Sequence, residues 1–178
     1  GSSTYVYNSS DHIITSTDLS TWVSNPAPAG MDGLSAVTYG AGRFVITGWG
    51  GNPDVATSTD GTSWTTMPSP DAIWVGATYG DNKFLVTGFN GEGMYAECIG
   101  SGNPPPAGAC TGDRTWTQIA GDMGFGTVDM SGDAQNMIAG AGSAGPTGGV
   151  YRSTNGGTSW AVVDLPGTYN GMDVSISD

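Results

Sequence analysis

The sequence has very little positive charge. Its 178 residues include only 4 Lys and Arg against 16 Asp and Glu, and the formal net charge is −12. Charged residues make up 11% of the chain, whereas a typical soluble domain has about 25%. A protein that binds nucleic acid needs a basic surface that displaces counterions. The composition therefore excludes nucleic acid as a partner.

Long apolar runs and metal-ligating residues are also scarce. No apolar stretch approaches the roughly 20 residues of a membrane-spanning helix, so we expect no membrane span. The single histidine, His12, has no second histidine with which to build a zinc site. There is no phosphate-binding loop and no Ser–His–Asp arrangement around a sharp strand–helix turn. We expect no metal and no cofactor.

What the sequence does contain is an internal repeat. Four segments share a Ser/Thr–Asp/Gly turn pattern that ends in tryptophan: Ser16–Trp22, Ser58–Trp64, Thr111–Trp116 and Ser153–Trp160. A second repeated element precedes these turns. In it, residues 37–48 match residues 77–88, and a weaker copy covers residues 128–140. Each copy has the pattern of a β-hairpin, two β-rich runs around a Gly/Asn/Asp turn. Each unit is thus predicted to be a four-stranded meander of about 40–45 residues, which is typical of a β-propeller blade.

The repeat predicts an all-β fold, a β-propeller of four four-stranded antiparallel blades. We expect blade 1 at residues 1–30 plus 167–178, blade 2 at 31–70, blade 3 at 71–122 and blade 4 at 123–166. In this scheme residues 172–177 pair with residues 4–8 and close the ring, which removes free sheet edges. Two alternatives stay open: strand exchange between molecules that builds a filament, and a segment of a longer propeller.

The turn motif resembles the Asp-box, or bacterial neuraminidase repeat, Ser-X-Asp-X-Gly-X-X-Trp. Residues 153–160 match it with Asn at the Asp position, residues 58–64 are one residue short, and the other two copies depart further. In such a turn Asp accepts hydrogen bonds from backbone amides, Gly permits a positive φ, and Trp fills the gap between blades. We therefore expect structural roles for Asp18, Trp22, Asp60, Trp64, Asp113, Trp116, Asn155 and Trp160.

Some Asp-box propellers are sialidases, and that resemblance implies three converging arginines, a Tyr–Glu pair and an acidic proton donor. The three arginines here, Arg43, Arg114 and Arg152, lie near turns, and both glutamates, Glu92 and Glu97, lie in one hairpin. We therefore predict that the protein is not an enzyme. A divergent or truncated sialidase-like glycoside hydrolase is the alternative.

The two cysteines, Cys98 and Cys110, flank the turn between the third and fourth strands of blade 3. Cysteines at the base of a hairpin are well placed for a disulfide, which would stabilise the fold by about 3 kcal/mol for a loop of this size. A disulfide implies an oxidising location. We therefore expect an extracellular protein that is secreted, displayed on a cell surface or part of a virus particle.

A candidate binding face lies where the second-to-third-strand turns meet the links between blades. Trp49 and Phe89 occupy the same repeat position there, with Asn90, Asp71 and Trp74 nearby. Aromatic rings beside acidic and amide groups suit a glycan or a protein, although the two rings could instead pack between blades. We predict a non-catalytic binding or structural module. The remaining alternative is a building block that self-assembles through complementary termini.

Overall fold

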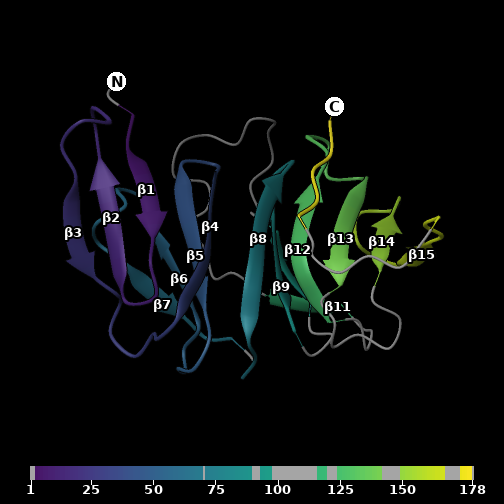
Figure 1. Cartoon of the computed structure of the whole chain (residues 1–178), viewed down its shortest axis with the longest axis horizontal. Helices are drawn as coiled ribbons and strands as arrows, with labels where there is room; N and C mark the ends of the chain where they lie inside the picture. Colours follow the sequence, from purple (N-terminus) through teal and green to yellow (C-terminus); the bar gives the residue numbers. More distant parts are fainter. Residues whose placement is uncertain are drawn as a thin grey trace.

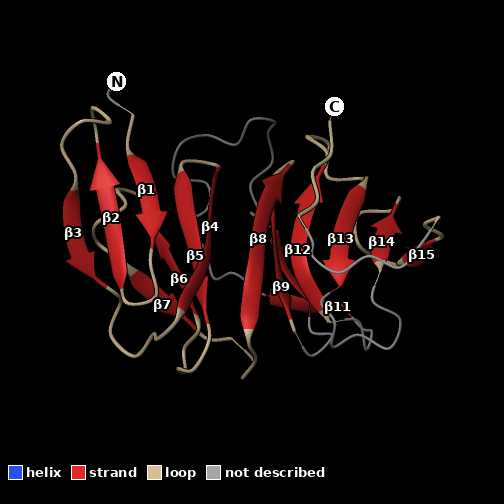
Figure 2. Cartoon of the chain, viewed as in Figure 1, coloured by secondary structure: helices blue, strands red, loops and turns tan. Residues whose placement is uncertain are grey.

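The structure is a computed structural model that describes residues 3–69, 71–89, 93–97, 116–119, 124–141, 149–166 and 173–177. Every regular element among these residues is a β-strand (Figure 2). The all-β prediction is confirmed, and the described residues contain no helix that could span a membrane.

The strands form four antiparallel sheets that follow one another along the chain (Figure 1). The first sheet contains β1 (Tyr5–Asn8), β2 (His12–Ser16) and β3 (Val23–Pro26). The second contains β4 (Leu34–Gly40), β5 (Arg43–Gly48), β6 (Val55–Ser58) and β7 (Thr65–Met67). The third contains β8 (Trp74–Gly80), β9 (Lys83–Gly88), β10 (Gly93–Glu97) and β11 (Trp116–Ile119). The fourth contains β12 (Phe125–Met130), β13 (Met137–Ala141), β14 (Val150–Ser153) and β15 (Ala161–Val163).

Each sheet is a meander, in which strands that follow one another along the chain are antiparallel neighbours. The β4–β5 and β8–β9 hairpins have two-residue loops, Ala41-Gly42 and Asp81-Asn82, in which both residues have a positive φ. Such loops match the natural twist of the strands that they connect. Local sequence therefore sets the register of these hairpins.

The core lies between the sheets. Ile13 of the first sheet packs with Ile46 of the second, and Val45 of the second packs with Trp74 and Phe84 of the third. Leu85 of the third sheet packs with Met130 and Met137 of the fourth. One mode of packing, sheet face against sheet face, therefore recurs at all three junctions of the described chain.

The first and fourth sheets lie at opposite ends of the molecule (Figure 1). Residues 173–177 form no strand, and they run beside β12, where Ser175 Oγ and Ile176 N donate hydrogen bonds to Asp129 Oδ2 (3.2 and 2.8 Å). Among the described residues, β1 pairs with β2 alone. The expected pairing of residues 172–177 with residues 4–8 is thus not formed in this structure, because the segment is held at the far end from β1. The blade limits stay a prediction.

Candidate binding face

The loops β1–β2 and β5–β6, residue 89 after β9, and the links β3–β4 and β7–β8 lie at one edge of the molecule. We call this edge the loop face, and its described residues are 9–11, 27–33, 49–54, 69, 71–73 and 89. The opposite edge, which we call the turn face, carries the first-to-second-strand hairpin turns and the Ser–Asp turns. Of the candidate binding residues that the sequence singled out, Trp49, Asp71 and Phe89 belong to the loop face, and Trp74 begins β8 next to it.

Trp49 is the largest exposed side chain of the loop face, with 51% of its surface accessible. Its backbone N–H lies 3.1 Å from the carbonyl oxygen of Asp32 and 3.2 Å from that of Gly33. The indole ring lies against Gly33, where a Cβ atom would stand 2.5 Å from Cε2 of the ring. The ring is therefore held by the preceding link and still presents half its surface to solvent.

The loop that carries Trp49 is tied down by its own backbone. Gly51 N donates to Asp54 Oδ1 (3.0 Å), and Gly48 N donates to the carbonyl oxygen of Asp54 (2.9 Å). Gly51 also stands so close to the carbonyl oxygen of Gly30 that no side chain fits at that position. The Asn52–Pro53 peptide bond is cis. These contacts fix the loop against the link at residues 30–33.

Asp54 is a buried carboxylate at the base of the same loop, with only 1% of its surface exposed. Burial raises the pKa of Asp54, the hydrogen bond from Gly51 N lowers it, and the negative charge of Asp71 raises it further. Sequence reasoning missed Asp54 because a single Asp before a strand carries no signal of its burial. Among the described residues, no cluster of three His, Cys, Asp or Glu side chains could hold a metal ion.

Phe89 lies on the loop face of the third sheet, and 38% of its surface is exposed. Its N–H donates to the carbonyl oxygen of Ile73 (3.0 Å), and Ile73 is itself exposed. Asp71 is exposed on the same link. Ile73 is therefore a further candidate binding residue, which the sequence pattern did not single out.

Trp74 does not belong to this surface. The sequence predicts a binding role for Trp74, and this prediction is wrong, because Trp74 is completely buried between the second and third sheets, against Val45, Val55 and Phe84. Its exposure depends on residues that are distant in sequence, which is why its position next to the loop face was misleading. Asn90 lies outside the described residues.

The Ser–Asp turns lie on the turn face, and their polar side chains form hydrogen bonds with the backbone of the same turn. Asp18 Oδ1 accepts hydrogen bonds from Thr21 N (2.7 Å) and Ser20 N (2.8 Å), and these lower the pKa of Asp18 to about 2. Asp60 makes the same pair of contacts, and the backbone N–H groups of Ser63 and Thr62 hold its pKa well below the usual range.

Asn155 replaces Asp in the last of these turns and keeps the same geometry. Its Oδ1 accepts from Ser159 N (3.0 Å) and Ser153 Oγ (2.9 Å). A neutral amide and a carboxylate thus stabilise this turn through the same backbone contact. Asp113 lies outside the described residues.

The tryptophans that end these turns differ in burial. Trp64 and Trp160 are half-buried, and their Nε1–H groups donate to the carbonyl oxygens of Gly61 (3.1 Å) and Gly157 (3.2 Å). Trp22 is 45% exposed. Cys98, Cys110 and the side chain of Trp116 lie outside what the structure describes.

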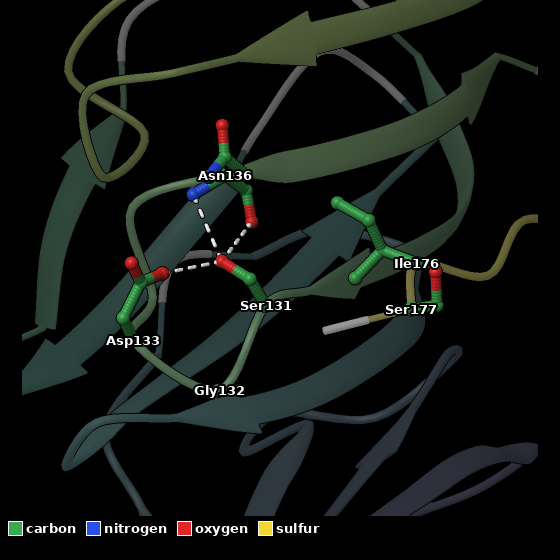
Figure 3. A pocket seen from close by; sticks show the side chains of 6 residues that line it. All are labelled: Ser131, Gly132, Asp133, Asn136, Ile176 and Ser177. Atoms are coloured by element: carbon green, nitrogen blue, oxygen red, sulfur yellow. Dashed lines mark hydrogen bonds between the residues drawn. The ribbon is translucent and has the colours of Figure 1, made fainter.

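A hollow of about 540 Å³ opens on the turn face between the β12–β13 turn and the C-terminal segment. Figure 3 shows its lining residues, Ser131, Gly132, Asp133, Asn136, Ile176 and Ser177. Ser131 Oγ donates to Asp133 Oδ1 (2.6 Å) and accepts from Asn136 N (3.0 Å). The side chains of Ser131 and Asp133 are thus engaged within the turn, and no aromatic side chain is among the lining residues.

Comparison with known proteins supports the architecture. No family model and no curated protein matches the sequence. Among solved structures, YCF48 from Cyanidioschyzon merolae superposes with a TM-score of 0.59 at 16% identity, over 86% of this chain and 53% of its own. YCF48 bound to D1 peptide gives 0.56 at 12% identity, over 78% of this chain and 41% of its own.

A GH74 xyloglucanase from Xanthomonas campestris also superposes, with a TM-score of 0.59 at 16% identity, over 90% of this chain and 28% of its own. These neighbours are β-propeller proteins, and at such low identity the likeness shows the fold alone. The chain spans about half the length of the YCF48 proteins, or less.

Proposed function

We propose that the chain is a non-catalytic binding module of β-propeller architecture whose loop face recognises a polypeptide segment of a partner protein. The observation that carries this proposal is the half-exposed indole of Trp49 on a loop that backbone contacts hold in place. An aromatic side chain that is already ordered loses little conformational freedom on binding, which is what a binding hot spot requires.

A polypeptide partner suits the chemistry of this face. Trp49, Ile73 and Phe89 are exposed apolar side chains on neighbouring sheets, and such groups dominate protein–protein contacts. One of the similar structures is YCF48 bound to D1 peptide, so this fold can present a peptide-binding surface. A glycan is the other candidate ligand, because an indole ring on a face that also carries the exposed residues Asp32 and Asp71 suits a sugar.

The finer assignments belong to the same proposal. The Ser–Asp turns support membership of the Asp-box propellers, and the four sheets support a unit of four blades. A disulfide between Cys98 and Cys110 and an extracellular or virus-particle location are also proposed. The intact mass of the unreduced protein after alkylation tests the disulfide, because two alkylated thiols would remove the argument for an oxidising compartment.

A glycoside hydrolase is the second candidate function. It is favoured by the raised pKa of Asp54 near Asp71, since such enzymes pair a carboxylic acid of raised pKa with a second carboxylate. Against it, Asp54 is almost fully buried, so a substrate could not reach it. Arg43 and Arg152 lie in the second and fourth sheets, which are not neighbours. The binding function is therefore the better supported.

Two screens test the proposal. The purified chain is used to select ligands from a displayed random-peptide library and is applied in parallel to a glycan array. Peptides that bind wild type and fail to bind a Trp49→Ala, Phe89→Ala variant support the proposal, and glycans with that behaviour identify the other ligand class. Turnover of chromogenic glycosides that is lost in Asp54→Asn would contradict a non-catalytic role.

A further inference from the structure

The first sheet exposes apolar side chains on its side that faces away from the second sheet. Tyr5 pairs with Ser16 as Phe44 pairs with Ser58, so the cross-strand register makes β1 equivalent to β5. Tyr5 and Tyr7 therefore stand where Phe44 and Ile46 stand in the second sheet. These are the positions from which a sheet contacts the sheet before it.

The equivalent positions are buried in every other sheet. By the repeat and the strand registers they are Phe44, Ile46, Phe84, Val86, Met137 and Ala139, none of which is more than 7% exposed. Tyr5 and Tyr7, by contrast, are 39% and 59% exposed. In the part of the chain that the structure describes, the first sheet thus carries core-type residues with no neighbouring sheet on that side.

Trp22 extends the same surface. Trp64 packs against the cluster formed by the first and second sheets, and Trp160 packs against the cluster formed by the third and fourth. Trp22 occupies the equivalent repeat position in the first sheet and is 45% exposed. We call the surface of Tyr5, Tyr7 and Trp22 the end face.

The fourth sheet presents the complementary half of such a junction. Ile138 and Val150 are equivalent by register to Val45 and Val55, which face the next sheet and are fully buried. Ile138 and Val150 are only half-buried. The side of the fourth sheet that faces away from the third sheet is therefore partly exposed. It offers the end face the same kind of packing surface that the second sheet offers the third.

Residues 173–177 continue the series of neighbouring first strands that β8 and β12 form in the third and fourth sheets. Thr78 Oγ1 of β8 donates to Asp129 Oδ1 of β12 (3.2 Å), and Ser175 Oγ donates to Asp129 Oδ2 from the other side. Residues 173–177 thus lie beside β12 as β12 lies beside β8, without a sheet of their own. A strand in this position could add to the free edge of β1, as extended segments add to exposed sheet edges.

We propose that the end face binds the fourth sheet of a second copy of this chain, whose residues 173–177 pair with β1, so that two copies close one ring. The same type of junction already occurs three times within the chain. The two ends lie far apart (Figure 1), and 86% of the chain superposes on only 53% of a YCF48 propeller. The chain thus matches about half of a longer β-propeller, which leaves room for a second copy in one ring.

Such a head-to-tail contact uses two different surfaces and closes when the rotation permits. Each copy carries a net charge of −12, and repulsion between copies opposes their association. Because salt screens this repulsion and leaves apolar contacts intact, the pair is expected to become more stable as ionic strength rises.

The test is the mass of the chain in solution, measured by light scattering and sedimentation from about 1 to about 100 μM in about 0.15 and about 0.5 M NaCl. We expect a species of twice the 18.0 kDa chain mass, with more of it at the higher salt. A species that stays at 18.0 kDa under all conditions would overturn the proposal, whether the chain is open or closed on itself.

Tyr7→Asp should leave the chain folded, because the side chain is exposed, and should shift it to the single-chain mass. Val162→Asp is the matched control, since Val162 is equally exposed but lies on the outermost strand of the fourth sheet, and it should still pair. Circular dichroism checks the fold of both variants. Pairing by Tyr7→Asp at the wild-type level would overturn the proposal.

A mixing experiment distinguishes head-to-tail pairing from contact between two end faces. Tyr7→Asp keeps an intact fourth sheet, and Ile138→Asp keeps an intact end face. Each alone should remain single, and their equimolar mixture should recover the two-chain mass through one intact junction. A mixture that stays at the single-chain mass would contradict the head-to-tail arrangement.

Discussion

The indole ring of Trp49 lies on the backbone of Gly33, and a Cβ atom on residue 33 would stand 2.5 Å from Cε2 of the ring. Gly33 has a φ of +57°, a conformation that side chains disfavour. The link before the second sheet and the exposed ring of its loop are therefore one unit, and a change in the link should move the ring.

Gly33→Ala should destabilise the fold and displace the indole of Trp49. The positive φ alone costs about 1–2 kcal/mol, and the clash with the ring adds to it. Gly42→Ala is the matched control, because Gly42 has a φ of +73° and nothing lies within 4 Å of its Cβ position. Urea unfolding should show a larger loss for Gly33→Ala, and the excess should vanish in a Trp49→Ala background.

Leu19→Gly should stabilise the protein. Leu19 has a φ of +60° in the first Ser–Asp turn, where the second and fourth turns place glycine at positive φ, and its side chain is exposed. Relief of the backbone strain should outweigh the greater freedom of glycine in the unfolded chain, for a net gain of about 0.5–1 kcal/mol. A lower thermal midpoint for Leu19→Gly would show that its side chain packs more than its exposure suggests.

Asp60→Ala should cost about 1 kcal/mol, because it leaves two turn amides without their acceptor, whereas Asp60→Asn should cost less, as the Asn155 turn indicates. The pKa of Asp60 is lowered in the folded state. Its contribution is therefore present above the usual pKa near 3.8 and is lost as the pH falls through the folded-state value. Acid unfolding of Asp60→Asn should accordingly show a weaker dependence on pH than wild type.

Asp54→Asn should act in the opposite direction. Burial raises the pKa of Asp54, so the stability tied to its protonated form is present below the usual value and is lost as the pH rises through the folded-state pKa. The variant should therefore raise the urea midpoint at neutral pH, with a gain that disappears near about pH 3. Asp71→Asn, which removes the nearby charge, should give a smaller gain. A destabilised Asp54→Asn at neutral pH would show that the carboxylate makes a favourable contact there.

How far the sequence predicted the structure depends on how local each feature is. The turns around Asp18, Asp60 and Asn155 are set by hydrogen bonds that span two to four residues, so the motif alone carries their geometry. The β4–β5 and β8–β9 hairpins are equally local. Strand order within each sheet could be inferred for the same reason.

Features that depend on residues distant in the sequence could not be predicted in the same way. Trp49 and Trp74 are tryptophans at or near one face, yet only the structure shows that Val45 and Val55 of another sheet bury Trp74. Asp54 is buried because the links at residues 30 and 69 cover its loop. The sequence predicted that residues 172–177 pair with residues 4–8, but it could not show that Asp129 would instead hold residues 173–177 beside β12.

The central claim is that the Trp49 and Phe89 side chains form the recognition surface. The most direct measurement is a calorimetric titration of a peptide selected on wild type into three proteins: wild type, Trp49→Ala with Phe89→Ala, and Tyr39→Ala. Tyr39 is a comparably exposed aromatic residue at the turn-face end of β4. The account predicts a loss of at least about 2 kcal/mol for the double variant, an unchanged affinity for Tyr39→Ala, and native circular dichroism for all three. Equal affinity of wild type and the double variant would contradict it.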